Sequence, residues 1–186
     1  GGERPGRLLV LPFRQLEGRV GHPVHPLVLV LAQGRLELLG QLRGQGPEGL
    51  RDREVCIVVL SGRADIEASG QKWSAVGERT SVFDDAPPAA VYAPAGETVT
   101  VTANTQAEIA VARAPGSTDR PARLVDPATM NKTTRGEGLN TRYVRDILPQ
   151  TEPADSLLVV EVRTPSGHSS SYPPHKHDTD DLPAES

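Results

Sequence analysis

The side chains best suited to chemistry lie in the segment SYPPHKHDTDDLPAES at the end of the chain. His175 and His177 are two residues apart, so on an extended strand both imidazoles point to one face while Lys176 points to the other. Neutral imidazoles are ligands for zinc, iron, nickel and manganese. Pro173 and Pro174 stiffen the backbone before them and lower the entropy lost on fixing the ligands. This is the spacing that part of a metal site on a β-strand would use.

Two imidazoles do not complete such a site, because zinc sites use three or four protein ligands. An exposed His-Lys-His stretch in a tail is the alternative interpretation, and spacing alone favours it. Further candidate ligands are the carboxylates that follow, one histidine before the pair and two far upstream: Asp178, Asp180, Asp181, Glu185, His168, His22 and His25. The polar segment TDDLPAES indicates a solvated turn for the carboxylates. The three-residue step of HPVHP does not align two side chains on one face of a strand.

Composition and charge exclude several classes of protein. The net charge is −4 and the basic residues are scattered, which argues against a nucleic-acid partner. Aromatic residues make up 3%, which argues against a carbohydrate module built on stacking rings. The apolar run LVLVLA is far shorter than the ~20 residues of a membrane helix. The single cysteine, Cys56, lies in the apolar run EVCIVVLSG, which predicts a buried, unreactive thiol. We therefore expect a cytoplasmic protein with no membrane partner.

Short strands separated by turns dominate residues 54–113. EVCIVVL is a continuous apolar run, whereas RADIEA and ETVTVTA alternate between apolar and polar residues with a period of two. Ser61-Gly62, Ser69-Gly70 and Pro94-Ala95-Gly96 are turn signals between them. Strands and turns at this spacing predict an all-β fold, as an antiparallel sandwich or barrel.

The remaining segments set the predicted domain boundaries. PLVLVLAQGRLELLG predicts further strands, with residues 36–42 either strand or helix, and residues 116–137 are polar and proline-bearing, as in a surface connection. NTRYVRDIL and SLLVVEVRT resume the strand pattern. We predict a first lobe at residues 1–115, a connecting segment at 116–138 and the start of a second, incomplete lobe at 139–186.

Four segments carry a resemblance to a known family. They are REVCIVVLSGRADIEASGQ, SVFDDAPPAAVYAPAG, RGEGLNTRYVRDILP and, most specifically, YPPHKHDTDDLP with an upstream Gly-His. They resemble the 5-deoxy-glucuronate isomerases of inositol catabolism, bicupins related to 5-keto-4-deoxyuronate isomerase. The resemblance implies two cupin-type β-barrels, with a structural first lobe that holds no metal. Two features of the sequence agree: Val99 stands where a cupin histidine ligand would be, and no His-x-His precedes Glu54.

The resemblance also implies a site and a reaction. His175 and His177 are the implied ligands of a divalent metal, most simply Zn²⁺. Family members continue into a strand with a ligand glutamate and a later histidine, so the chain resembles a member cut through its metal site, and the glutamate role is not transferred to Glu185. The implied reaction is a metal-assisted aldose–ketose isomerisation of 5-deoxy-glucuronate, a sugar acid, to 5-dehydro-2-deoxy-gluconate. We expect the 186-residue chain to bind metal weakly and to be inactive by itself.

Several roles stay open at this stage. The catalytic base is unassigned among His168, Tyr172 and Lys176, and Arg142 either faces a carboxylate or forms a surface ion pair. Unpaired strand edges in an incomplete lobe favour a homo-oligomer. The alternative functions are a non-catalytic sugar-binding cupin that has lost its metal site and a lobe that serves oligomerisation.

Overall fold

The computed structural model describes residues 7–14, 27–31, 34–38, 53–117 and 120–169. The strands are β1 (Arg7–Arg14), β2 (Leu27–Leu31), β3 (Gly34–Leu38), β4 (Arg53–Ser61), β5 (Ala64–Ala68), β6 (Gln71–Val76), β7 (Ala89–Ala93), β8 (Val99–Ala103), β9 (Ala107–Pro115), β10 (Arg123–Val125), β11 (Lys132–Arg135), β12 (Arg142–Leu148) and β13 (Leu157–Thr164). The 3₁₀ turns η1 (Pro127–Thr129) and η2 (Gly138–Asn140) flank β11. No helix in the described ranges has the length and hydropathy needed to cross a bilayer.

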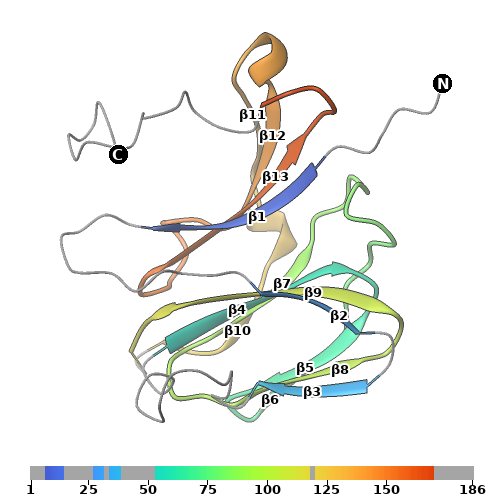
Figure 1. Ribbon diagram of the computed structural model, residues 1–186. Coiled ribbons are helices and arrows are strands. Elements are labelled where there is room, and N and C mark those ends of the chain that lie inside the picture. Colours follow the sequence, from blue (N-terminus) through green and yellow to red (C-terminus); the bar gives the residue numbers. More distant parts are fainter. Residues whose placement is uncertain (1–6, 15–26, 32–33, 39–52, 118–119, 170–186) are drawn as a thin grey trace.

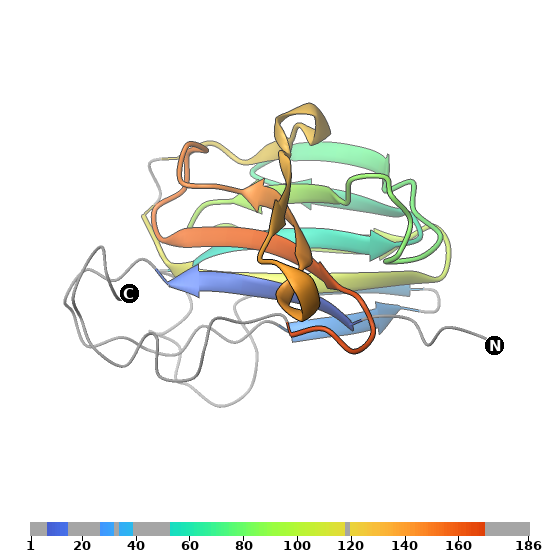
Figure 2. The ribbon, with the colours of Figure 1, turned by 90° about the horizontal axis from the view of Figure 1, so that it is seen from above.

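The strands form three stacked layers (Figure 1). The sheet orders are β1-β13-β12-β11, β10-β7-β4-β9-β2 and β3-β8-β5-β6. The five-stranded sheet lies in the middle, and seen from above the β1-β13-β12-β11 sheet extends across it (Figure 2). The middle and lower sheets pack face to face as a cupin-type sandwich, so the predicted all-β fold is confirmed.

Strand β4 shows why a continuous apolar run was needed in the middle layer. Because successive side chains point to opposite faces, Ile57 and Val59 pack into the core of the sandwich while Val58 and Leu60 pack toward the upper sheet. All four are at most 2% exposed. Strand β5 belongs to an outer sheet and alternates between buried and half-buried residues, as its sequence predicts.

Cys56 lies on the upper face of β4 and is fully buried, which confirms the prediction of a buried thiol. Burial raises the pKa of this thiol to about 12, although the nearby Arg123 guanidinium acts to lower it. The thiolate is the nucleophilic form of cysteine, so Cys56 has no chemical role here.

Strands β1, β10 and β11 pair in ways that the sequence did not predict. Strand β1, which the predicted boundaries place in the first lobe, pairs with β13 of the upper sheet, with Val10 opposite Glu161. Strands β10 and β11 both lie within the predicted connecting segment and extend the middle and upper sheets. Of residues 36–42, which the sequence left open between strand and helix, residues 36–38 belong to strand β3 and residues 39–42 lie outside the described residues. Strands β1, β10 and β11 have eight, three and four residues. Their pairing partners therefore depend on tertiary contacts rather than on their own sequence pattern. The lobe boundaries themselves stay a prediction.

Candidate functional site

The predicted metal ligands His175 and His177 lie outside the described residues, as do Tyr172 and Lys176. Within the described ranges no group of three or more His, Cys, Asp or Glu side chains is placed to hold a metal ion. The metal site therefore stays a prediction. The described residues show how the chain leaves β13 toward that segment and which side chains lie on β12 and β13.

His168 fixes the chain where it leaves β13. Its Nδ1 lies 3.0 Å from the carbonyl oxygen of Thr141, and because a carbonyl only accepts, Nδ1 carries the proton and donates. The next residue, Ser169, donates its backbone N–H to Leu139 O at 2.8 Å. These bonds tie residues 168–169 to the loop before β12. His168 therefore anchors a turn.

The two faces of the β12–β13 pair have different surroundings. On one face, Arg145 and Glu161 are cross-strand partners and contact the first lobe. The next pair along the strands, Val144 and Val162, points to the opposite face and is nearly fully buried. Arg142 follows on that same face because it is two residues before Val144.

Arg142 is only 6% exposed, so the alternative of a surface ion pair is wrong. Its Nη1 donates to the backbone and side-chain oxygens of Asn140 at 3.1 and 3.3 Å. Gly136, with φ +76°, packs against this guanidinium, and a Cβ atom there would lie 2.9 Å from Arg142 Nη1 and 2.1 Å from Asn140 O. The glycine-rich turn before β12 therefore holds the guanidinium in a fixed position.

The two positions related to cupin ligands are used for packing and for joining the middle sheet to the upper sheet. Val99 is buried in the core of the sandwich. Glu54 is fully buried on the opposite face of β4, and its carboxylate accepts hydrogen bonds from Tyr92 Oη at 2.7 Å and from the backbone N–H groups of Asp155 (2.8 Å), Ser156 (2.6 Å) and Leu157 (2.6 Å). We call this set the Glu54 clamp. Burial, and then the hydrogen bond to Glu54, raise the pKa of Tyr92 above its usual range.

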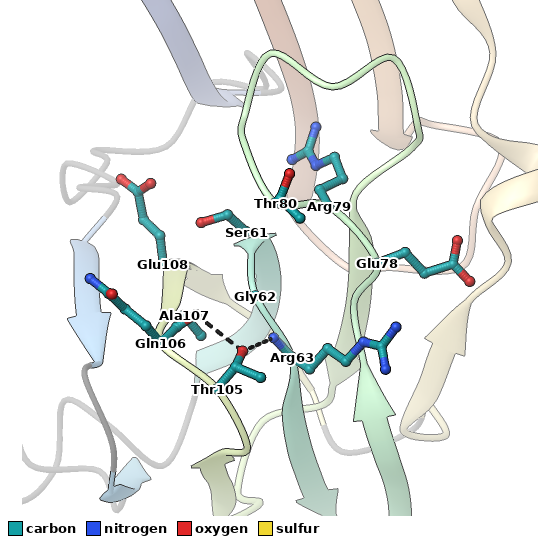
Figure 3. A pocket seen from close by; sticks show the side chains of 10 residues that line it. All are labelled: Ser61, Gly62, Arg63, Glu78, Arg79, Thr80, Thr105, Gln106, Ala107 and Glu108. Atoms are coloured by element: carbon teal, nitrogen blue, oxygen red, sulfur yellow. Dashed lines mark hydrogen bonds between the residues drawn. The ribbon is translucent and has the colours of Figure 1, made fainter.

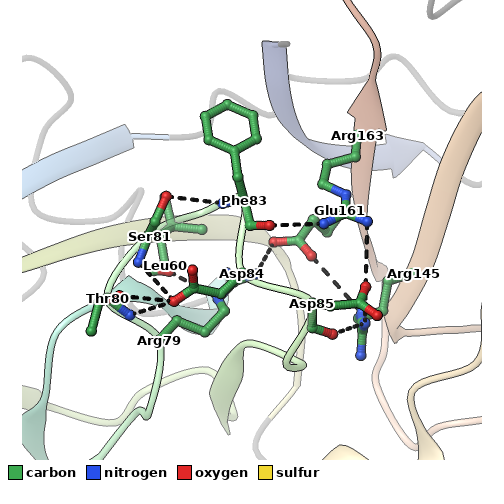
Figure 4. Close-up of polar contacts among 10 residues, drawn as sticks. All are labelled: Leu60, Arg79, Thr80, Ser81, Phe83, Asp84, Asp85, Arg145, Glu161 and Arg163. Atoms are coloured by element: carbon green, nitrogen blue, oxygen red, sulfur yellow. Dashed lines mark hydrogen bonds and ion pairs between the residues drawn. The ribbon is translucent and has the colours of Figure 1, made fainter. Parts of the chain in front are cut away.

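A second polar junction joins the middle and upper sheets at the other end of β4 (Figure 4). Arg79 is 2% exposed, donates from Nε to Leu60 O at 3.0 Å, and forms an ion pair with Glu161 at 2.7 Å. The sequence did not predict this pair. The available signal was one glutamate inside the apolar strand SLLVVEVRT, because a charge there must be paired.

The loop after Arg79 adds further contacts to the upper sheet. Asp85 forms ion pairs with Lys132 and, at 3.3 Å, with Arg163, and its backbone carbonyl accepts from Arg145 Nη2 at 2.8 Å. The hydrogen bond and charge of Lys132 hold the pKa of Asp85 below its usual range. Arg163 Nη1 also donates to Phe83 O at 3.0 Å. The loop thus fixes the orientation of β12 and β13 over the first lobe.

An open pocket of about 640 Å³ lies at one end of the sandwich (Figure 3). It is lined by Ser61, Gly62, Arg63, Glu78, Arg79, Thr80, Thr105, Gln106, Ala107 and Glu108. Its floor is fixed backbone, since the Arg63 carbonyl accepts from Asn104 N and Thr105 N at 2.9 and 3.3 Å. Gly62 has φ +80°, and a Cβ there would lie 2.1 Å from Gln106 O. The ten lining residues include neither histidine nor cysteine, so this set does not match the predicted metal chemistry.

Comparison with known proteins shows the family of this chain. The model of the KduI/IolB family matches residues 33–186. A 5-deoxy-glucuronate isomerase from Geobacillus kaustophilus is 50% identical over 136 residues, which are 73% of this chain and 49% of that protein. The protein of the same name from Geobacillus thermodenitrificans is 48% identical over 135 residues, again 73% of this chain and 49% of the relative.

A solved structure supports the same family assignment. The crystal structure of an IolB-like protein from Salmonella typhimurium LT2 superposes with a TM-score of 0.75 and 35% identity, covering 95% of this chain and 67% of that one. The chain spans about half the length of the curated relatives it matches. The resemblance predicted from the sequence motifs is confirmed, and the chain belongs to the KduI/IolB family.

Proposed function

We propose that this chain is part of a sugar-acid isomerase that converts 5-deoxy-glucuronate to 5-dehydro-2-deoxy-gluconate. The observation that carries the proposal is the 50% identity over 136 residues with a relative named 5-deoxy-glucuronate isomerase. Because this chain spans about half of that relative, the comparison does not show the isomerase activity for this chain, and we propose it instead.

The reaction needs no oxidant or reductant. One proton leaves the carbon beside the aldehyde and one is returned to the former aldehyde carbon. The hydroxyl on the neighbouring carbon gives its proton to the aldehyde oxygen, so this hydroxyl becomes the ketone and the aldehyde oxygen becomes a hydroxyl. When bound to His175 and His177, a divalent ion such as Zn²⁺ would act as a Lewis acid toward the substrate oxygens. The described residues hold the strand that leads into this segment. The Glu54 clamp and the Arg79–Glu161 pair both contact β13.

The decisive experiment is turnover by the protein that contains this chain. Incubation with 5-deoxy-glucuronate in D₂O should produce a ketone carbon signal in ¹³C NMR. His175→Ala and His177→Ala should each abolish it, whereas the matched histidine variant His22→Ala should retain it. Turnover that persists in both ligand variants, or none in the unchanged protein, contradicts the proposal. Binding of sugar acids without any turnover would favour the alternative of a non-catalytic sugar-binding cupin.

We also propose that the 186-residue polypeptide by itself binds Zn²⁺ weakly and does not turn over, because two imidazoles leave the coordination shell open. Titration calorimetry of the isolated polypeptide that gave tight one-to-one binding would contradict this. The homo-oligomer and the cytoplasmic location stay predictions.

A further inference from the structure

The open pocket of about 640 Å³ at one end of the sandwich has the size of a small-molecule site. Its walls come from the turn between β4 and β5, the turn between β8 and β9, and residues 78–80. Backbone hydrogen bonds hold these walls together, because Gly62 N donates to Arg79 O at 2.8 Å and Asn104 N donates to Arg63 O at 2.9 Å. The fold therefore sets the shape of the pocket, and a ligand does not have to order the backbone.

One wall of the pocket carries a hydrogen-bond acceptor that the fold does not use. Glu108 is half-buried on β9 and lies opposite Ser61 of β4 in the strand register. Figure 3 shows the Ser61 side chain pointing toward Glu108, whereas Arg63 and Glu78 point to the other side. In the part of the chain that the structure describes, the Glu108 carboxylate has no hydrogen bond or ion pair.

Arg79 brings a hydrogen-bond donor to the same pocket. It is 2% exposed, its Nε donates to Leu60 O at 3.0 Å, and its Nη1 pairs with Glu161 at 2.7 Å, so its charge is already neutralised. Its Nη2 is buried and has no hydrogen-bond partner among the described residues. A buried donor without an acceptor destabilises a fold, so such a group in a native protein calls for an explanation.

These two unused groups define the chemistry of a ligand. A hydroxyl group serves both, because it accepts a hydrogen bond from Arg79 Nη2 and donates one to Glu108. The Ser61 hydroxyl and the Gln106 amide in the same lining can donate as well as accept. An anion is disfavoured, because it would approach the Glu108 carboxylate while the charge of Arg79 is paired with Glu161. The described lining residues include no aromatic ring, so hydrogen bonds rather than stacking would supply the affinity.

We propose that this pocket binds a small neutral polyol, whose hydroxyl groups donate to Glu108 and accept from Arg79. The proposal goes beyond the proposed isomerase and does not depend on it, because none of the lining residues belongs to the predicted metal segment. Arg79 also pairs with Glu161 of β13, so the ligand would contact the junction between the middle and upper sheets.

The test compares two acyclic probes on the protein that contains this chain. D-gluconate carries a carboxylate where D-glucitol carries a terminal hydroxymethyl group, so the pair isolates the effect of a negative charge. In ¹⁵N-labelled protein, the amide chemical shifts of Gly62 and Ala107 report both the affinity and the place of binding. D-glucitol should shift these amides saturably, and D-gluconate should bind about tenfold more weakly or less tightly still.

Glu108→Gln keeps the shape of the side chain and removes its charge. It should weaken D-glucitol binding about three- to tenfold, because a charge-assisted hydrogen bond becomes a neutral one. It should also narrow the preference for D-glucitol over D-gluconate, which a side chain used only for packing would not do. The matched control is Glu97→Gln, an exposed glutamate that precedes β8 whereas the pocket follows β8, and it should change neither affinity.

A second variant tests the donor. Arg79→Met/Glu161→Leu removes Nη2 together with the buried ion pair, so no buried charge is left without its partner. It should also weaken D-glucitol binding several-fold. Unchanged D-glucitol affinity in this folded double variant would show that Arg79 does not contact the ligand and would overturn its role.

The outcomes separate this inference from the proposed function. D-glucitol has no aldehyde to isomerise, so His175→Ala should leave its binding unchanged, and a loss of binding in that variant overturns the pocket. The absence of saturable shifts, equal affinities for the two probes in the unchanged protein, or unchanged affinities in Glu108→Gln also overturn it. Turnover of 5-deoxy-glucuronate tests the isomerase alone, so either proposal can fail without the other.

Discussion

The substitution Glu54→Gln tests how the upper sheet is joined to the middle sheet. Glu54 is fully buried, and its two oxygens divide four donors between them: Oε1 accepts from Ser156 N and Leu157 N, and Oε2 accepts from Tyr92 Oη and Asp155 N. Glutamine has almost the same shape, but one of its two terminal atoms is an NH₂ group that donates and cannot accept. At least one donor of the clamp must therefore lose its acceptor.

The size of the effect follows from which donors can adapt. If the amide oxygen replaces Oε1, the NH₂ group faces the Tyr92 hydroxyl and the Asp155 N–H. The hydroxyl can turn and accept, but the backbone N–H is left unsatisfied, which costs roughly 1–3 kcal/mol. Exchanging charge-assisted hydrogen bonds for neutral ones costs roughly 1–2 kcal/mol more. The smaller desolvation cost of the amide acts in the opposite direction, so we expect a loss of about 2–4 kcal/mol in the free energy of unfolding.

Urea unfolding measures this directly, followed by circular dichroism and by the fluorescence of Trp73, the single tryptophan, on β6. For a chain of this size the loss corresponds to a fall in Tm of roughly 4–16 °C. The matched control is Glu152→Gln, whose partly exposed carboxylate makes one ion pair to Arg123 at 3.4 Å and should change stability by no more than about 1 kcal/mol. If Glu54→Gln loses no more than this control, the clamp does not hold the lobes together and the reasoning is wrong.

Three further predictions concern Arg79, Asp85 and Cys56. Arg79→Met should destabilise the protein by about 2–4 kcal/mol because it leaves Glu161 buried beside only a distant Arg145, whereas the double variant Arg79→Met/Glu161→Leu should recover most of the loss in urea unfolding. The depressed pKa of Asp85 means that its pair with Lys132 stabilises the fold above the unfolded value of ~3.9 and is lost as pH falls through the folded pKa; Asp85→Asn should therefore flatten the acid limb of stability against pH. Cys56, fully buried with a raised pKa, should react with a thiol reagent only as fast as the protein unfolds, and rapid labelling of the native protein would contradict its placement.

The sequence predicted the strands whose pattern depends on local chemistry. The alternation of β5 and β8 indicated half-buried strands, and the apolar run of β4 indicated a buried one. A run that is apolar on both faces shows only that both faces are covered. It does not say that a third sheet covers one of them. That sheet includes β1, whose partner β13 is about 150 residues away in the chain, so no local pattern could reveal the pairing.

The polar junctions between the lobes were harder to predict. Glu54 stood at the start of β4, where comparison with cupins drew attention to metal ligation, but its side chain faces the backbone N–H groups of residues 155–157. Its partners there are backbone groups, which every residue carries, so they leave no trace in the sequence. Arg79 and Glu161 do have a charge signature, but 82 residues separate them and many other pairings were possible.

The two junctions together explain how the upper sheet is oriented. Between them lies an apolar interface of residues such as Val58, Leu60, Ile147 and Val159, and apolar contact by itself allows sheets to slide and rotate because it is not directional. The Glu54 clamp fixes the first residue of β13, and the Arg79–Glu161 pair fixes the same strand four residues later. Two directional contacts along one strand determine both its position and its angle. The residues at the far end of that strand, including Thr164, therefore have a defined position relative to the middle sheet.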